Sequence, residues 1–267
     1  MKKNFLVTIL ISNYNKQKYI KKCLESCLYQ SYKNLEIIVC DNNSTDNSKK
    51  IISIYPEIKL IKQKRNSDYS SVNQTRCIKK GLRIAKGDYV FLLDSDDFFE
   101  KKKVFKVVEY LNKKRCDFIQ DKSYLIFKNK KKKLILKKNY FSIWPRFYNT
   151  STMVFERKYL NFLFRHVIDT KIPLVEIDTQ VFLYQFFFKK NLNLLKNYLT
   201  NYRLHNENLM KNFPFLSLSW WIRRYYVYKF FFSLSDKEKK DVPLKLDYIF
   251  ALVIFYSCKF FKISMKI

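Results

Sequence analysis

Asp94 and Asp96, two aspartates separated by a single serine, are the residues of this sequence best placed to do chemistry. In a near-extended segment, residues i and i+2 project to the same side, so the two carboxylates can face one ligand. Because negative charges this close repel each other, a hard divalent cation is their natural partner, with coordination sites left for diphosphate oxygens and water. The alternative is an acidic helix N-terminus, where the helix dipole favours aspartate.

The residues before this pair form a continuous apolar run, Tyr89–Leu93, typical of a buried parallel strand. Phe5–Ile11 is an earlier apolar run of this kind, and the shorter runs Leu35–Cys40 and Ile58–Ile61 are also expected to be strands. Helical apolar spacing separates the runs and predicts helices at Ile20–Leu28, Lys49–Tyr55, Val72–Ala85 and Val104–Leu111. The alternation predicts an α/β fold with a Rossmann-like, mainly parallel sheet and helices on both faces.

After residue 116 the rhythm changes. We expect three further strands, at Asp117–Phe127, Leu134–Leu136 and Thr152–Phe155. The lysine run Lys130–Lys133 is interpreted as a solvated turn, and the aromatic segment Thr179–Phe188 as a helix. Beyond about residue 211 the sequence is basic and aromatic without strand patterns, which predicts a first domain of residues 1–210 and a helical extension of residues 211–267.

Polar clusters follow three of the predicted strands where they end, at Ser12–Asn15, Asp41–Asp46 and Asp94–Asp97. Asn, Asp and Ser are ordinary turn residues, so one cluster alone means little. In an open α/β sheet, however, ligands bind at the carboxyl ends of the strands. Three clusters at strand exits therefore predict one ligand-binding rim.

Glycine is scarce, since only Gly81 and Gly87 occur. A Gly-rich dinucleotide fingerprint and a Walker A loop both need glycines at spacings that this chain does not have. A metal or basic side chains must therefore carry most of any phosphate binding. Gly87 follows the third predicted helix near the position that helix-ending glycines favour.

The chain is strongly basic, with 53 Lys and Arg against 23 Asp and Glu and a net charge of +30. This excess favours anionic partners such as phosphorylated substrates, an anionic membrane or nucleic acid, although an AT-rich genome would also enrich lysine. Six scattered cysteines without a C-x-x-C pair argue against structural zinc and fit a reducing compartment. The short N-terminal apolar run lacks a cleavage site, so we expect a strand rather than a signal peptide.

Four segments together resemble the family 2 inverting glycosyltransferases. They are Ile9–Asn15, Leu24–Tyr32, Leu35–Asp46 and Ala85–Asp97, the last of which resembles the family's D-x-D strand. The resemblance covers roughly residues 5–210 and is most specific in the first hundred. It implies a GT-A fold and a glycosyltransferase of the bacterial cell-surface polysaccharide type. It also implies a nucleotide-sugar donor, a Mn²⁺ or Mg²⁺ ion, and inversion at the anomeric carbon.

The resemblance also implies roles for individual residues. Ser12 and Tyr14 would touch the nucleoside base, and Asp41 would lie in the uridine pocket with Asn42 beside it. Asp94 would lie near the ribose and the metal, and Asp96 would bind the metal. Three positions depart from the family pattern: Ser12-Asn13 replaces Pro-Thr, Asn42 replaces a second Asp, and Ile78-Lys79 replaces Arg-Asn. The base therefore stays open between uracil, thymine and guanine.

Inversion requires in-line attack by an acceptor hydroxyl whose proton a carboxylate removes. Family members often carry Glu-Asp at a helix start, and here Glu176 and Asp178 precede the predicted helix. We favour Asp178 as the base over Glu176, with an ordinary helix N-cap as the alternative. By resemblance, Arg203 and His205 would hold the diphosphate as it leaves, since this group gains negative charge in the transition state. A structural hydrogen bond is the alternative for His205.

The extension mixes aromatic and cationic residues, above all in Trp220–Phe232, and is more apolar at Tyr248–Phe261. Such residues settle at membrane interfaces, so we expect amphipathic helices on the inner leaflet. Helices packed on the catalytic domain are the alternative, and no RNA-binding motif supports a nucleic-acid partner. The longest charge-free runs near this end, Asn212–Ile222 and Tyr248–Cys258, fall short of the ~20 residues that span a bilayer.

These features predict a metal-dependent hexosyl- or N-acetylhexosaminyltransferase. It would move a sugar, most simply from a UDP-sugar, to a hydroxyl of a glycan or lipid-linked acceptor in surface polysaccharide synthesis. The expected location is cytoplasmic, peripheral at the inner face of the plasma membrane. The alternatives are a sugar nucleotidyltransferase, which needs a Gly-rich loop that is absent here, and a non-catalytic membrane or polyanion binder with the same fold. The oligomeric state stays open.

Overall fold

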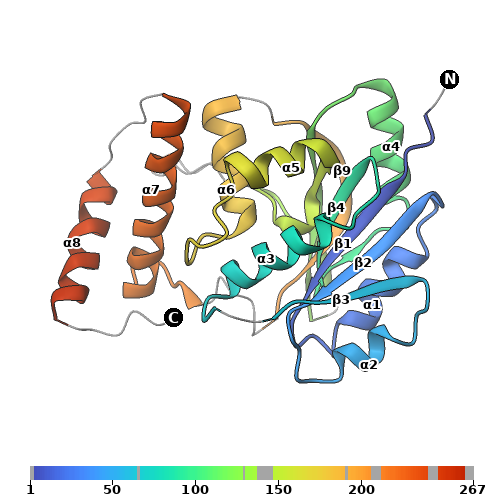
Figure 1. Ribbon diagram of the computed structural model, residues 1–267, viewed down its shortest axis with the longest axis horizontal. Helices are drawn as coiled ribbons and strands as arrows, with labels where there is room; N and C mark the ends of the chain where they lie inside the picture. The colour runs from blue at the N-terminus through green and yellow to red at the C-terminus, as the bar shows by residue number, and fades with distance from the viewer. Residues whose placement is uncertain are drawn as a thin grey trace.

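The computed structural model describes residues 3–64, 67–128, 130–136, 147–189, 192–205, 212–239 and 246–261. Its first four strands are β1 (Val7–Asn13), β2 (Leu35–Asp41), β3 (Ile58–Lys62) and β4 (Tyr89–Asp94). They lie in the order β3-β2-β1-β4, and every neighbouring pair is parallel (Figure 1). The four strands that the apolar runs predict are confirmed, with ends that differ by one or two residues.

The second half of the sheet is mixed. Its strands are β5 (Phe98–Phe99), β6 (Phe118–Phe127), β7 (Lys130–Lys133), β8 (Met153–Glu156) and β9 (Leu194–Arg203). The order continues from β4 through β8, β6 and β9 to β5. β8 runs antiparallel to both β4 and β6, whereas β6 and β9 are parallel. The sheet is therefore parallel as predicted as far as β4, and largely antiparallel beyond it.

The lysine run Lys130–Lys133 is a strand, so its prediction as a solvated turn is wrong. It forms β7, which pairs antiparallel with β6, and all four side chains are exposed. Residues Leu134–Leu136, predicted as the strand, are irregular. Backbone pairing with β6 decides this outcome, and charged side chains are typical of an edge strand that must stay unpaired on its outer side. Lys131 also lies 2.6 Å from Glu100 and over the ring of Tyr124.

Helices cover both faces of the sheet, as predicted. α1 (Ile20–Leu28), α2 (Ser48–Ile52) and α4 (Lys103–Lys113) cover one face, and α3 (Ser70–Leu82), α5 (Arg157–His166) and α6 (Ile177–Leu183) cover the other (Figure 1). Successive residues of β1 serve the two faces in turn. Ile9 and Ile11 pack into the core under α1 and α4, whereas Leu10 packs into the core under α3. Burial on both faces explains why β1 reads as a continuous apolar run.

Downstream, the predicted helix Thr179–Phe188 is confirmed in place but divides in two. α6 begins at Ile177, and a π-helical segment, Tyr184–Lys189, continues it. A 3₁₀ turn, Thr150–Thr152, precedes β8. The sequence patterns did not predict α5, β5 or β9.

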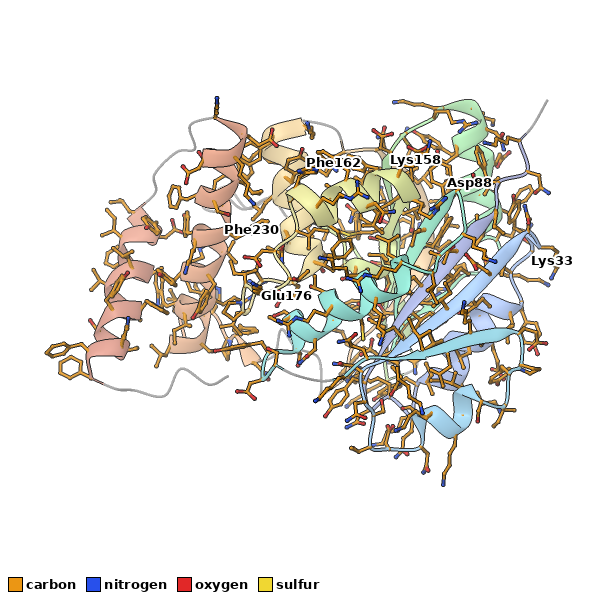
Figure 2. The ribbon with its side chains drawn as sticks, in the orientation of Figure 1. Lys33, Asp88, Lys158, Phe162, Glu176 and Phe230 are labelled. Atoms are coloured by element: carbon orange, nitrogen blue, oxygen red, sulfur yellow. The ribbon has the colours of Figure 1, made fainter. Side chains whose placement is uncertain are left out.

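The C-terminal extension is helical, with α7 (Leu218–Glu238) followed by α8 (Leu246–Phe260). α7 packs onto the catalytic fold: its apolar side chains, among them Phe230 and Phe231, join the core shared with β4, α5 and α6 (Figure 2). α8 lies outside α7 (Figure 1). The predicted boundary after residue 210 lies outside the described residues. Among the helices that the structure describes, none is long and apolar enough to cross a bilayer.

Gly87 does not end a helix, contrary to the prediction. α3 ends at Leu82, and Gly87 has no positive φ. Instead, a Cβ at Gly87 would lie 2.4 Å from the backbone nitrogen of Thr8 in β1. The chain therefore needs glycine here because the approach to β4 passes directly against the neighbouring strand. At Gly81, a Cβ would meet only the side chain of Leu10, at 2.2 Å from Cδ1.

We therefore expect Gly87→Ala to destabilise the protein more than Gly81→Ala. The first substitution forces backbone apart and should lower the free energy of unfolding by about 1–3 kcal/mol. At Gly81 the Leu10 side chain can rotate, and alanine adds up to about 1 kcal/mol of helix propensity inside α3. Urea denaturation of both variants measures the difference. Equal stabilities, or the reverse order, would contradict the steric role of Gly87.

Candidate functional site

The three polar clusters meet at one rim, as predicted. The strand register places Ser12 of β1 between Cys40 and Asp94, and Asn13 beside Asp41. Side-chain hydrogen bonds join the clusters: the Ser12 hydroxyl donates to Asp94 Oδ1 at 3.3 Å, and the Asn13 amide donates to Asp41 Oδ1 at 2.8 Å. The carboxyl ends of β1, β2 and β4 thus form a single polar edge of the parallel half-sheet.

Asp41 and Asn42 are buried at the point where β2 ends and the following loop begins. Asp41 is completely buried and accepts bonds from the backbone N–H and the hydroxyl of Ser44, at 2.9 and 2.6 Å. Asn42 is also buried, and its N–H donates to the Asn13 carbonyl at 2.8 Å. Asn42 Oδ1 has no hydrogen-bond partner among the described residues. A buried amide oxygen without a partner indicates a place where a polar ligand group binds. Tyr14 is partly buried in the adjoining loop.

Asp94 carries an unusually basic carboxylate. Its Oδ1 accepts from Gln74 Nε2 at 2.6 Å and from Ser12. Burial, together with the charges of Asp96 and Asp178, raises the pKa of Asp94 to about 7. The segment leads into β5, and the next helix, α4, begins only at Lys103. The alternative of an acidic helix N-terminus is therefore wrong for this pair.

Asp96 is surrounded by positive charge. Its Oδ2 lies 2.9 Å from His205 Nε2 and 3.2 Å from Lys16 Nζ. Burial disfavours the charged carboxylate, but the bond from His205 and the charge of Lys16 outweigh it and hold the pKa of Asp96 below its usual value. Asp96 therefore stays ionised next to a neighbour, Asp94, that titrates near neutrality.

The two aspartates fit a divalent cation. All side-chain bonds of Asp94 go to Oδ1 and all those of Asp96 go to Oδ2, so the second oxygen of each accepts no bond from the residues that the structure describes. These are hard oxygen donors of the kind that Mg²⁺ and Mn²⁺ prefer. Within the described ranges, no group of three or more His, Cys, Asp or Glu side chains encloses a metal site. Phosphate oxygens and water would have to supply the remaining ligands.

Arg203 and His205 lie beside this turn, and Tyr19 lies between them. The Arg203 guanidinium is 4.9 Å from the centroid of the Tyr19 ring, and the His205 ring stacks on the same ring at 4.7 Å. The bond between His205 and Asp96 agrees with the structural alternative for this histidine, and it also places the imidazole beside the D-x-D turn. Both predicted residues therefore reach the rim.

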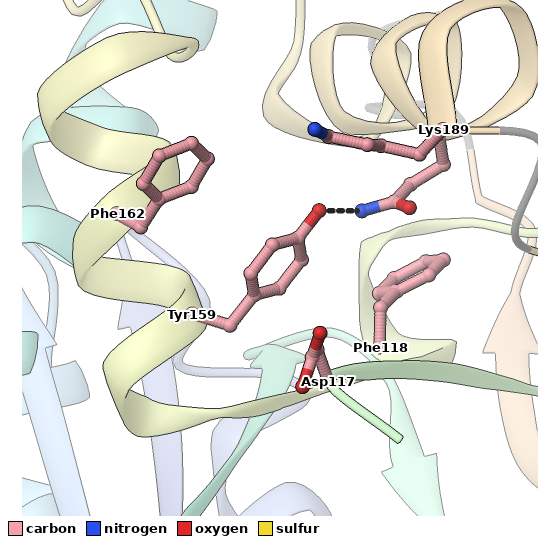
Figure 3. A pocket seen from close by; sticks show the side chains of 6 residues that line it. Asp117, Phe118, Tyr159, Phe162 and Lys189 are labelled. Atoms are coloured by element: carbon pink, nitrogen blue, oxygen red, sulfur yellow. Dashed lines mark hydrogen bonds between the residues drawn. The ribbon is translucent and has the colours of Figure 1, made fainter.

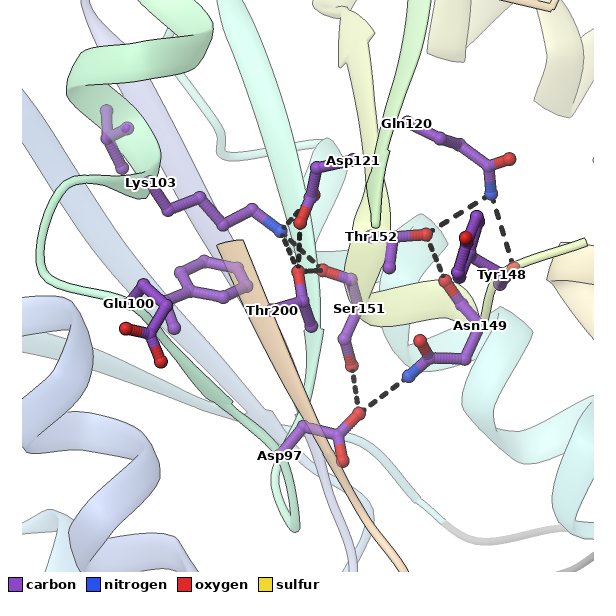
Figure 4. A network of polar contacts seen from close by, with 12 residues as sticks. Asp97, Glu100, Lys103, Gln120, Asp121, Tyr148, Asn149, Ser151, Thr152 and Thr200 are labelled. Atoms are coloured by element: carbon purple, nitrogen blue, oxygen red, sulfur yellow. Dashed lines mark hydrogen bonds and ion pairs between the residues drawn. The ribbon is translucent and has the colours of Figure 1, made fainter. Parts of the chain in front are cut away.

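Asp97 ties the rim to the second half of the sheet. It is buried and accepts from Ser151 Oγ at 2.6 Å, from Asn149 Nδ2 at 2.7 Å and from the Arg203 N–H at 2.9 Å. Burial and the charges of Asp96 and Asp94 raise its pKa. The three bonds fix the segment before β8 and the end of β9 against the D-x-D turn. Figure 4 shows the two bonds to Asn149 and Ser151.

A buried ion pair supports this connection from behind. Lys103 and Asp121 are both completely buried, with 2.8 Å between Nζ and Oδ1. Lys103 Nζ also donates to Thr200 Oγ1 and to the Ser151 carbonyl, each at 2.7 Å (Figure 4). Burial lowers the pKa of Lys103 and raises that of Asp121, and the charge of each residue opposes the shift of the other. Ser151 thus links this pair to Asp97.

Asp178 and Glu176 lie at the start of α6 but have different surroundings. Glu176 is the residue that caps α6, and its Oε2 lies 2.5 Å from an Arg223 nitrogen of α7. Asp178 lies inside the first turn, so the N-cap alternative is wrong for it. Burial and the charge of Glu176 raise the pKa of Asp178 to about 6, while Arg223 opposes the rise. Asp178 is therefore a carboxylate poised near neutrality, whereas Glu176 is held in an ion pair.

The carboxylates share one environment. Burial and the charges of Asp97, Asp96, Asp178 and Asp94 all raise the pKa of Tyr202, a residue of β9. All the predicted site residues therefore reach this region of the molecule: Ser12, Tyr14, Asp41, Asn42, Asp94, Asp96, Asp178, Arg203 and His205. The rim also contains residues that sequence reasoning missed: Lys16, Tyr19, Gln74, Tyr202 and Arg223. Lys16 directly follows the first polar cluster, which could have identified it, but nothing local distinguishes Gln74 or Arg223.

A separate hollow of about 380 Å³ lies at the opposite end of the strands (Figure 3). Its walls come from the start of β6, from α5 and from the π-helical segment: Asp117, Phe118, Tyr159, Phe162, Gln185 and Lys189. Tyr159 and Gln185 bond to each other across it at 2.7 Å. It contains none of the rim residues, so it plays no part in the site.

The chain matches a known protein family over part of its length. A family model described as glycosyl transferase family 2 matches residues 8–173. The chain is similar to the Escherichia coli UDP-Glc:alpha-D-GlcNAc-diphosphoundecaprenol beta-1,3-glucosyltransferase WfaP, with 35% identity over 120 residues, which cover 45% of this chain and 47% of WfaP. It is also similar to chondroitin synthase of E. coli, with 39% identity over 99 residues, 36% of this chain and 14% of that enzyme. The chain thus spans less than half the length of each of these relatives.

Solved structures show a related fold over nearly the whole chain. Staphylococcus aureus TarS 1–349 in complex with UDP matches with a TM-score of 0.64 at 16% identity, covering 97% of this chain and 72% of TarS 1–349. The mannosyltransferase PcManGT from Pyrobaculum calidifontis, in complex with GDP-Man and Mn²⁺, matches with a TM-score of 0.59 at 14% identity, covering 96% and 75%. At these identities the likeness extends to the fold alone, and it confirms the predicted GT-A-like α/β architecture.

We expect Lys103→Met to lower the free energy of unfolding by about 3–5 kcal/mol, because it leaves Asp121 as a buried charge without its partner. Urea denaturation measures the loss. The double variant Lys103→Met/Asp121→Leu removes both charges and should recover much of it. A single variant as stable as the wild type, or a double variant less stable than the single one, would contradict this account of the ion pair.

Proposed function

Because this chain belongs to glycosyl transferase family 2, we propose that it transfers a sugar from a nucleotide-diphosphate sugar to an acceptor hydroxyl, with inversion at the anomeric carbon. The observation that carries the proposal is the single rim that holds a D-x-D pair, two cationic side chains and a carboxylate titrating near neutrality. The D-x-D pair suits binding of the diphosphate. The cationic side chains suit departure of the leaving group, and the carboxylate suits removal of a proton.

The donor is proposed to be a UDP-sugar. Ser12 and Tyr14 border the place for the base, with Asp41 fixing the loop and Asn42 offering an amide oxygen that has no partner among the described residues. Such an oxygen could accept a hydrogen bond from the N–H edge of uracil once the loop opens toward the ligand. The name of WfaP contains UDP-Glc, and TarS was solved with UDP, which supports the same base. The sugar would be a hexose or an N-acetylhexosamine.

Asp94 and Asp96 are proposed to hold Mn²⁺ or Mg²⁺ through the two oxygens that accept no bond from the described residues. When bound there, the cation would neutralise the donor diphosphate and the charge that develops on it. Lys16 and His205 orient Asp96, and Gln74 orients Asp94. Arg203 adds positive charge where the leaving phosphate gains negative charge, and His205 adds an imidazole there.

Asp178 is proposed as the general base. As the acceptor oxygen bonds to the anomeric carbon, its proton passes to the Asp178 carboxylate, and the bond between that carbon and the diphosphate oxygen breaks. The nucleoside diphosphate leaves with the electron pair. A base with a pKa of about 6 is ionised at neutral pH and still basic enough to accept the proton. Glu176 suits this role less, because Arg223 holds its carboxylate.

The acceptor is proposed to be a hydroxyl of a glycan or of a lipid-linked saccharide in surface polysaccharide synthesis. The names of WfaP, which contains a diphosphoundecaprenol acceptor, and of chondroitin synthase support this class. The reaction would then take place in the cytoplasm, at the inner face of the plasma membrane. The 211–267 extension would be the membrane-associating part.

We expect Asp96→Asn to lower the turnover number by at least about 10²-fold, because it removes a charged oxygen ligand and weakens the hold on the diphosphate. Release of UDP from UDP-sugars in the presence of Mn²⁺ measures the rate. The Mn²⁺-dependent rise in melting temperature on adding UDP should also shrink, because ligand binding stabilises the folded state.

Asp236→Asn is the matched control, since Asp236 is exposed at the far end of α7. It should keep both the turnover number and the thermal shift. Wild-type rates and wild-type shifts in Asp96→Asn would count against the metal–diphosphate site.

Asp178→Asn should lower the turnover number by about 10²- to 10⁴-fold. In the wild type the turnover number should fall tenfold per pH unit below about pH 6, because protonation of Asp178 removes the base. Glu176→Gln should keep most of the activity. It should move this acidic limb to lower pH, because the charge of Glu176 raises the Asp178 pKa and Arg223 lowers it. A Glu176→Gln variant that is inactive, beside an active Asp178→Asn, would assign the base to Glu176 instead.

A further inference from the structure

α8 turns an uncharged apolar face to solvent. Its exposed large side chains recur every three or four residues, a spacing that places them on one side of a helix. They are Leu246, Ile249, Phe250, Val253, Tyr256 and Phe260. Leu246 is 76% exposed, Phe250 59% and Phe260 81%. This set, called the α8 face below, continues into Phe261 and runs the full length of the helix.

The opposite side of α8 is fixed to α7. Phe255 stacks on Tyr225 with 3.8 Å between ring centroids, and Ala251 is completely buried. Asp247 is also turned inward: its Oδ2 accepts from Arg224 Nε at 2.8 Å, and its Oδ1 accepts from Tyr228 Oη at 2.5 Å. The helix therefore has one orientation on the molecule, and its acidic residue points away from the α8 face.

Aromatic rings extend this apolar surface toward the start of α7. Phe215, 76% exposed, contacts Trp220 with 5.3 Å between centroids. Trp220 contacts Trp221 at 4.7 Å, and Trp221 contacts Phe250 at 6.1 Å. The α8 face and the start of α7 thus form one continuous surface, in which two tryptophans lie between the helices.

We propose that the α8 face docks on an anionic phospholipid bilayer. The proposal rests on the proposed function, since a lipid-linked acceptor stays in the bilayer. A protein partner would need polar groups to fix its register, because protein interfaces carry about one hydrogen bond per 100–200 Å². The hydroxyl of Tyr256 and that of the exposed Ser257 are the polar side-chain groups on this side of α8 among the described residues. A bilayer requires only apolar area, and Trp and Tyr settle at its interface.

Charge selects an anionic bilayer. The chain carries a net charge of +30, and the same two helices carry exposed lysines, among them Lys229 of α7 and Lys259 of α8. Anionic lipids attract such residues over roughly a Debye length, about 8–10 Å at physiological salt. Insertion of the α8 face into the bilayer and electrostatic attraction of the basic surface then both favour membrane binding.

Flotation of the full chain with lipid vesicles tests the proposal. The wild type should float with vesicles of phosphatidylcholine and phosphatidylglycerol, and less with phosphatidylcholine alone. Ile249→Glu/Val253→Glu puts two carboxylates on the α8 face and should lower the partition coefficient at least about tenfold. The control Ile54→Glu/Phe105→Glu changes the charge equally at exposed sites just after α2 and on α4, and it should float like the wild type.

Three further measurements separate the possible causes of a change in flotation. Thermal denaturation checks that both double variants fold, and UDP binding with Mn²⁺, measured without lipid, should be the same in all three proteins. Brominated phosphatidylcholine in the vesicles should quench the tryptophan fluorescence of the wild type. Failure of UDP binding would overturn the proposed donor site and leave the docking result intact.

Three results would overturn the docking proposal. The first is wild-type flotation by the α8-face variant. The second is an equal loss in the control variant, which would show that net charge alone binds the vesicles. The third is a wild type that does not float but sediments as a dimer, with a monomeric α8-face variant, which would assign the face to a second copy of the chain.

Discussion

The carboxylate of Asp97 holds the two halves of this protein together at the point where the site is built. It ends the D-x-D turn of the parallel half, and its three hydrogen bonds reach Asn149, Ser151 and the backbone of Arg203 in the other half. A buried carboxylate is costly unless its oxygens are bonded, so these donors cannot be lost without moving the turn. The positions of Asp94 and Asp96, and of Arg203 beside them, all depend on this one anchor.

The sequence predicts the donor half well because its signals are local. Strands buried on both faces read as continuous apolar runs, and the loops that follow them are rich in turn residues, so β1, β2 and β4 and their polar exits can be placed without tertiary information. Gly87 shows the limit of such reasoning. Its position suggested a helix end, but its reason is a close approach to Thr8, which only the folded sheet creates.

The second half could not be predicted to the same extent, because tertiary pairing overrides local pattern there. The lysines of β7 form a strand only because β6 lies beside them. Glu176 and Asp178 read almost alike in the sequence, and what separates them is Arg223, a residue of a different helix. The family match supports the enzyme over the non-catalytic alternative, but it ends at residue 173 and does not reach either carboxylate.

The ion pair between Glu176 and Arg223 limits how α6 and α7 can vary independently of each other. The family match covers residues 8–173, which contain the three polar clusters, whereas Asp178 and the pair of Glu176 and Arg223 lie beyond it on α6 and α7. In the proposed function, α6 and α7 would form an acceptor module that meets the donor rim at one seam. Exchange of the acceptor module between relatives would have to carry both helices together, because α6 grafted without α7 would bring Glu176 to the seam with nothing to neutralise it.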